Sequence, residues 1–149
     1  MGANIHQVLL IVGTIICFAS VSNAAQGTAT FYETPYVPSA CNGFEDDGNL
    51  IAAASDSIWQ NRSACGRYYL VQCIGATNQA PQPCKHTAVE VKIVDYCPPG
   101  CRGTINLSKD AFSIIADPRA GRIKVNYTES SNMEKPEKHI LRRYGNGKL

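Results

Sequence analysis

The sequence predicts a small, mainly β domain that folds as a closed or nearly closed barrel. Two observations favour this fold class. Many short β-prone runs are separated by turn-forming residues at even spacing, and only one segment has a convincing helical pattern. The chain has 149 residues, which allows one compact domain with at most a short appendage.

Six segments are expected to form strands, in the order 28–32, 50–54, 67–74, 87–94, 104–107 and 121–127. The clearest of them alternates with period 2, so that Val89, Val91 and Ile93 share one face. A single helical turn carrying Ile58 and Trp59 is expected after the second strand. Loops rich in Gly, Asp, Asn and Pro separate these elements.

One helix is expected over residues 109–116. Ser108 precedes it and can accept a hydrogen bond from a backbone N–H of the first turn, which makes it an N-cap. Phe112 and Ile115 line one side of this helix and are expected to face the core. Pro118 disfavours helical geometry in the residue before it, so the helix is expected to end there.

The first 24 residues are expected to be a signal peptide. No charged side chain precedes Glu33, and residues 8–21 are nearly all apolar. This run is shorter than the roughly 20 residues that a membrane-spanning helix needs, and small residues around Ala24 suit cleavage. A retained anchor is the alternative. The prediction is a secreted, extracellular protein without membrane insertion after signal removal.

Removal of the signal peptide takes away Cys17 and leaves an even set of cysteines, namely Cys41, Cys65, Cys73, Cys84, Cys97 and Cys101. In a small exported domain this set predicts three disulfides, whose pairing the sequence leaves open. A zinc site formed by His86 with Cys84, Cys97 and Cys101 is the alternative. The spacings are not those of structural zinc sites, so no metal is expected.

The composition limits the classes of partner. The formal net charge of +2 is too small to predict nucleic-acid binding, and no glycine-rich phosphate-binding motif is present. We therefore expect no nucleic-acid partner and no cofactor. Residues 129–149 are rich in charge and poor in apolar pattern, which predicts a disordered tail after a domain over residues 25–128.

Three Asn-x-Ser/Thr sequons follow the expected signal peptide, at Asn61, Asn106 and Asn126. Asn61 lies in a polar, turn-like stretch and is the expected glycan acceptor. The other two lie in or beside strand-like runs, where a glycan would compete with packing.

Several short motifs occur in one order at characteristic intervals, at residues 27–32, 39–43, 58–61, 64–67, 91–97, 103–108, 111–112 and 115–117. Together they resemble the plant EG45-like domain proteins, a family that includes the plant natriuretic peptides and the citrus blight-associated protein. This family is related to the expansins and, more distantly, to barwin and family-45 endoglucanases. The resemblance covers residues 25–128. It implies a six-stranded, RlpA-like double-psi β-barrel with one or two short helices.

The resemblance also implies a cleft. Thr30, Tyr32, Asp95 and Asn106 match positions that line the cleft of expansin-like proteins, and Tyr96 is a further candidate. Hydrolytic and lytic relatives carry an Asp at the position of Asn106. Because an amide does not transfer protons, we expect no catalysis. A structural role, in which Asp95 caps the turn at 98–100, is the alternative for that carboxylate.

A second candidate site is a recognition segment within residues 36–73, which comprises Glu45, Asp46, Asp47, Trp59 and Arg67. The matching segment of plant natriuretic peptides is associated with hormone-like activity. We call Glu45, Asp46 and Asp47 the acidic loop. The alternatives are that the acidic loop is merely solvated and that Trp59 packs in the core.

The resemblance therefore implies a secreted, non-enzymatic, plant natriuretic peptide-like protein. It would act in the apoplast in water and solute homeostasis or biotic-stress signalling, as a monomer, through an unidentified cell-surface receptor. The alternative is an expansin-like protein that binds cell-wall polysaccharide or is weakly lytic.

Overall fold

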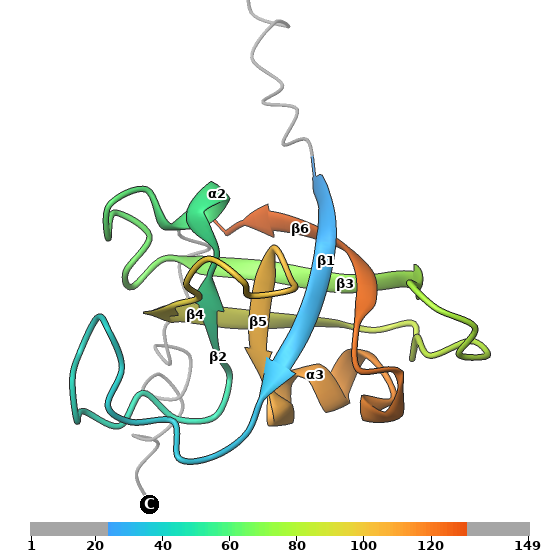
Figure 1. Cartoon of the computed structure of the whole chain (residues 1–149), viewed down its shortest axis with the longest axis horizontal. Helices are drawn as coiled ribbons and strands as arrows, with labels where there is room; N and C mark the ends of the chain where they lie inside the picture. The colour runs from blue at the N-terminus through green and yellow to red at the C-terminus, as the bar shows by residue number, and fades with distance from the viewer. Residues whose placement is uncertain (1–23, 131–149) are drawn as a thin grey trace, which may run out of the picture.

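Six strands close into a barrel in the computed structural model, which describes residues 24–130 (Figure 1). The strands are β1 (Ala25–Tyr32), β2 (Ile51–Ala54), β3 (Tyr68–Ala76), β4 (Ala88–Tyr96), β5 (Ile105–Ser108) and β6 (Ile123–Glu129). Their order around the barrel is β1-β5-β2-β4-β3-β6. β1 pairs with β5 and β2 with β4 in parallel, and the other pairs are antiparallel. The six-stranded double-psi β-barrel is confirmed.

The barrel interior is filled by the apolar face of each strand. Along β3 the side chains alternate between exposed and buried, and Val71 is fully buried. Val91 and Ile93 of β4 are also fully buried, as their alternation predicts. Burial of each such side chain contributes about 1.5–3 kcal/mol to the free energy of folding.

Three short helical elements complete the described fold: α2 (Asp56–Trp59), α3 (Lys109–Ile115) and the 3₁₀ turn η1 (Pro118–Ala120). The Ser108 Oγ accepts a hydrogen bond from the backbone N–H of Ala111 (3.1 Å), so Ser108 is the N-cap of α3. The buried Phe112 packs against Phe31 of β1, with ring centroids 4.9 Å apart. In Figure 1, α3 lies across one end of the barrel and α2 at the other.

Three disulfides join Cys41 to Cys65, Cys73 to Cys84 and Cys97 to Cys101. The predicted number of disulfides is confirmed, and the structure supplies the pairing. Since every cysteine of residues 24–130 is oxidised, none of them is available there as a thiolate ligand to zinc.

Two sequence predictions concern residues that the structure does not describe. Apart from Ala24, the expected signal peptide lies outside the described residues, and so does the expected tail beyond Ser130. Within residues 24–130, the helices are too short or too polar to cross a bilayer.

Candidate functional site

Four neighbouring strands bring polar side chains into one row on the outside of the barrel. Thr30 of β1 is the register partner of Asn106 of β5, and Ala53 of β2 is the partner of both Asn106 and Asp95 of β4. Ala53 faces away from the interior, whereas its neighbours Ala52 and Ala54 belong to the core. We call Thr30, Asn106 and Asp95 the polar row. Asn106 and Asp95 are two inter-strand spacings apart, about 10 Å.

An irregularity in β4 decides that Asp95 faces outward. Ala52 pairs with Ile93, but the next residue, Ala53, pairs with Asp95, so that Val94 is an extra residue in β4. The Val94 carbonyl accepts a hydrogen bond from the Cys41 N–H (2.9 Å) instead. This extra residue reverses the alternation after Ile93, because regular alternation would place Asp95 on the core face.

Thr30 and Asn106 are joined by a hydrogen bond. The Thr30 Oγ1 donates to the Asn106 Oδ1 at 2.8 Å, and both side chains are half-buried. Among residues 24–130, the Asn106 Nδ2 has no hydrogen-bond partner. The amide therefore has two N–H donors that are free to bind a ligand.

The Asp95 carboxylate is anchored through one oxygen. Its Oδ1 accepts hydrogen bonds from the backbone N–H groups of Ala40 (2.8 Å) and Tyr96 (2.9 Å). These contacts tie the loop after β1 to the end of β4. The structural alternative for Asp95 holds at a different place, because its contacts within residues 24–130 are with Ala40 and Tyr96 and not with the turn at 98–100. Within the described residues, the Oδ2 of Asp95 has no hydrogen-bond partner and can accept from a ligand.

Tyr32 lies two residues beyond Thr30 on β1, and its hydroxyl is buried with no hydrogen-bond partner within residues 24–130. Burial raises the pKa of Tyr32 well above its usual range, with smaller contributions from Asp95, Tyr36 and Asp47. The phenol therefore stays protonated. Its ring meets Tyr36 edge to face, with centroids 5.3 Å apart. A buried hydroxyl without a partner is costly in free energy.

A polar cleft of about 450 Å³ adjoins Tyr36 and is lined by Glu33, Thr34, Tyr36, Lys109, Asp110 and Ser113. The Tyr36 hydroxyl donates to the Asp110 Oδ2 at 2.6 Å, and Lys109 pairs with Glu33 at 2.7 Å. The sequence does not predict this cleft, because the loop after β1 and the start of α3 are far apart along the chain.

Tyr96 and Trp59 form an aromatic pair beside α2. Their ring centroids are 5.2 Å apart at an interplanar angle of 34°, and the Tyr96 hydroxyl donates to the Asp56 Oδ1 at 2.6 Å. Trp59 is half-buried and packs partly against the core, in agreement with the core-packing alternative. Tyr96 is the register partner of the core residue Ala54, so it lies on the opposite face of β4 from Asp95.

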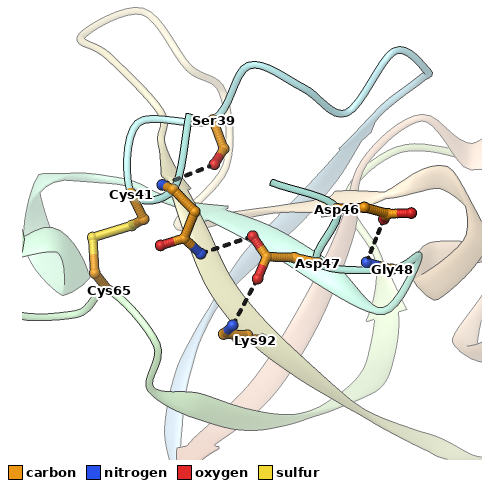
Figure 2. Close-up of polar contacts among 8 residues, drawn as sticks. Ser39, Cys41, Asp46, Asp47, Gly48, Cys65 and Lys92 are labelled. Carbon is orange, nitrogen blue, oxygen red and sulfur yellow. Dashed lines mark hydrogen bonds and ion pairs between the residues drawn. A yellow bond between two sulfur atoms is a disulfide. The ribbon is translucent and has the colours of Figure 1, made fainter. Parts of the chain in front are cut away.

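The acidic loop is held to the barrel through Asp47 (Figure 2). The Asp47 carboxylate contacts the Lys92 Nζ (2.6 Å) and the Asn42 Nδ2 (2.8 Å), and only 9% of its side chain is exposed. Burial acts to raise the pKa of Asp47, but the hydrogen bonds from Lys92 and Asn42 outweigh it and lower the pKa. Asp47 therefore has a structural role.

The other members of the recognition segment make contacts of their own. Glu45 and Asp46 are exposed, and the Asp46 Oδ1 accepts a hydrogen bond from the Gly48 N–H (2.8 Å). Arg67 pairs with Glu129 at the end of β6 (3.3 Å). The Cys41–Cys65 disulfide, visible in Figure 2, tethers the start of the acidic loop. Phe44, which no sequence motif singles out, is 82% exposed beside Glu45.

The sequons differ in accessibility. Asn61 is exposed in a turn after α2, whereas Asn106 and Asn126 are half-buried in strands. Glycosylation of Asn61 stays a prediction.

Comparison with known proteins identifies the family. A family model described as lytic transglycolase matches residues 51–127. An EG45-like domain containing protein from Citrus jambhiri is 53% identical over 126 residues, covering 83% of this chain and 96% of that protein. Expansin-B4 from Arabidopsis thaliana is 30% identical over 134 residues, covering 75% of this chain and 50% of the expansin.

Among solved structures, a mutant expansin from Clavibacter michiganensis in complex with cellohexaose has the same fold. It superposes with a TM-score of 0.53 at 24% identity, covering 72% of this chain and 50% of the expansin. With the barrel topology and the relatives in agreement, the chain belongs to the EG45-like domain proteins, which are related to the expansins.

Proposed function

We propose that this protein is a secreted, non-enzymatic protein of the plant apoplast that binds cell-wall polysaccharide through the polar row and Tyr32. One observation carries the proposal. Thr30, Asn106 and Asp95 lie side by side on the outer face of four adjacent strands. The related expansin with cellohexaose supports it, because that protein has the same fold and was solved with a glucan oligosaccharide.

The chemistry of the row suits sugar hydroxyls. The free Nδ2 of Asn106 can donate to a hydroxyl oxygen, while the free Oδ2 of Asp95 can accept from a hydroxyl. The buried Tyr32 hydroxyl would gain a partner from a bound sugar.

The same residues argue against glycan cleavage. Protonation of a leaving glycosidic oxygen requires an acid, and Asn106 occupies the position where lytic and hydrolytic relatives carry one. Asp95 is the only carboxylate of the polar row, so the row lacks the second carboxyl of a two-carboxylate mechanism. We therefore propose a binding protein, although the matching family model is described as lytic.

A receptor-directed signalling role is the second candidate, and the acidic loop favours it. The Cys41–Cys65 disulfide and the Asp47–Lys92 ion pair fix this loop, while Phe44, Glu45 and Asp46 remain exposed. A loop that is already ordered loses less conformational entropy on binding. In this second candidate function, the protein would act in water and solute homeostasis or in biotic-stress signalling.

Retention on insoluble wall polysaccharide tests the proposal. The secreted chain is mixed with cellulose or xyloglucan-coated cellulose, and the bound fraction is measured for the wild type, for Asn106→Ala and for Gln72→Ala. Gln72 is an exposed residue of β3, a strand outside the polar row, and serves as the matched control. We expect the wild type and the control to be retained and Asn106→Ala to bind about tenfold more weakly. A wild type that stays in the supernatant would contradict the proposal.

A further inference from the structure

A second depression, distinct from the cleft beside Tyr36, adjoins the polar row at Thr30. It has a volume of about 340 Å³ and is lined by Thr30, Thr77, Asn78, Arg102, Ala120, Gly121 and Arg122. We call it the arginine pocket. It is lined by two arginines and by no acidic residue, whereas Glu33, Asp110 and Lys109 line the cleft beside Tyr36.

The backbone around Arg102 is tightly held. The Cys97–Cys101 disulfide closes the loop that ends directly before Arg102. Gly103, directly after it, is buried so close to β1 that an added Cβ would lie 2.9 Å from the Thr30 Oγ1. The Thr104 N–H then donates to the Thr28 carbonyl at 2.8 Å. Arg102 is therefore presented from a fixed position beside Thr30.

The backbone of Arg122 is held by hydrogen bonds within the turn before β6 and with the loop after β3. Its N–H donates to the Ala120 carbonyl (2.7 Å), and its carbonyl accepts a hydrogen bond from the Thr77 Oγ1 (2.9 Å). The Asn78 Nδ2 also donates to the Ala120 carbonyl (3.2 Å). These contacts join the turn before β6 to the loop after β3, so the second guanidinium also extends from an ordered segment.

Neither guanidinium is neutralised within the described chain. The ion pairs found among residues 24–130 involve other basic residues, namely Arg67, Lys92, Lys109 and Arg119. The Arg122 Nε makes one long contact with the Thr77 Oγ1 (3.4 Å), and Arg102 has no side-chain hydrogen bond there. Two unneutralised guanidinium groups in one depression favour an anion, and a planar carboxylate matches the paired N–H groups of a guanidinium.

We propose that the arginine pocket binds the carboxylate of a uronate sugar, so that the ligand of this protein is an acidic polysaccharide such as a polygalacturonate. This inference rests on the proposed function, because Thr30 belongs both to the polar row and to the pocket. Sugar units along the row would present hydroxyl groups to Asn106 and Asp95. A unit at the Thr30 end would place its carboxylate between Arg102 and Arg122.

Calorimetric titration of the secreted chain tests this inference with three ligands: a de-esterified oligogalacturonate, its fully methyl-esterified counterpart and cellohexaose. The variants are Arg102→Gln, Arg122→Gln and the control Arg119→Gln. Arg119→Gln also removes one positive charge close by. The Arg119 guanidinium already pairs with Asp117 (2.6 Å), and Arg119 does not line the arginine pocket. We expect the de-esterified ligand to bind best. Arg102→Gln and Arg122→Gln should each weaken it about tenfold, and the control should change it less than about twofold.

Separate outcomes would overturn the inference and the proposed function. Equal losses of affinity in all three variants would mean that the ligand is attracted by diffuse electrostatics. Equal affinity of the wild type for the esterified and de-esterified ligands would mean that the carboxylate is not recognised. Either result overturns the arginine pocket as a uronate site. If the oligogalacturonate binds in an Arg102- and Arg122-dependent way while cellohexaose does not bind, the pocket stands and recognition of neutral glucan fails. Binding of cellohexaose without binding of the oligogalacturonate overturns the pocket alone.

Discussion

Asp95 and Asn106 face the same side of the barrel because each is a register partner of Ala53. An amide and a single carboxylate therefore lie about two strand spacings apart in the polar row. Both side chains can form hydrogen bonds with sugar hydroxyls.

The first prediction concerns catalysis. The wild-type protein should release no reducing sugar from cellulose, xyloglucan or chitin above a buffer blank, because Asn106 does not transfer a proton. Asn106→Asp should give at most a trace of activity, since an acid also needs a raised pKa that one substitution need not supply. Turnover by the wild type that is lost in Asp95→Ala would contradict the prediction.

The second prediction concerns the Asp47–Lys92 ion pair and its dependence on pH. The pKa of Asp47 is lowered in the folded state from its ordinary value of 3.8, so the pair stabilises the fold above that pH and loses its effect as the pH falls. Lys92 has a raised pKa because of its hydrogen bond with Asp47, so the pair persists up to strongly alkaline pH. Asp47→Asn should lower the free energy of unfolding by about 1–2 kcal/mol at neutral pH.

Urea unfolding with the disulfides intact measures this effect. The difference between Asp47→Asn and the wild type should shrink between neutral and acidic pH, because Asp47 becomes protonated in the folded state as the pH falls below its lowered pKa. The exposed Asp46→Asn is the control and should have little effect at either pH. A destabilisation of the same size at both pH values would show that the charge of Asp47 is not its source.

The third prediction concerns the disulfide pairing. Peptide mapping of the secreted, unreduced protein should recover the links Cys41–Cys65, Cys73–Cys84 and Cys97–Cys101 and label no thiol. Replacing Cys41 and Cys65 together by Ala should lower the free energy of unfolding by about 2–4 kcal/mol, because the unfolded chain gains freedom. Two or more alkylated cysteines in the native protein would be incompatible with the structure.

The fourth prediction concerns the acidic loop in the signalling candidate. Glu45→Ser combined with Asp46→Ser should weaken binding to the cell surface and reduce its salt dependence, because these exposed carboxylates would attract a basic receptor face. Asp47 is left unchanged, since its removal would loosen the loop itself. Glu90→Ser, an exposed charge change on β4, is the control. Unchanged binding at low and high salt would leave the loop as a merely solvated surface.

Much of the fold could be predicted from the sequence because it depends on local patterns. The alternation around Val91 and the N-cap at Ser108 require only neighbouring residues, and both are confirmed. The outward direction of Asp95 could not be predicted from local patterns. Regular alternation after Ile93 would direct it to the core, and only the extra residue Val94 turns it outward.

The remaining site features depend on contacts between distant segments. Asp47 lies in an acidic run that its sequence alone would predict to be solvated. In the structure it pairs with Lys92 of β4, which is 45 residues away in the sequence. Arg102 and Arg122 line one pocket because β5 and β6 both flank β1. Neither relationship has a local sequence signal, since strand order decides both.

Binding of cellohexaose to the wild type, to Tyr32→Phe and to Gln72→Ala, measured by calorimetry, tests the central claim most directly. Tyr32→Phe removes only the buried hydroxyl that has no partner within residues 24–130. If that hydroxyl bonds to a sugar, the variant should bind about five- to tenfold more weakly than the wild type, while its thermal stability should not fall. Gln72→Ala should bind as the wild type does. Equal affinity of all three proteins would contradict a hydrogen bond between the Tyr32 hydroxyl and the sugar, and no binding by the wild type would contradict recognition of neutral glucan at the polar row.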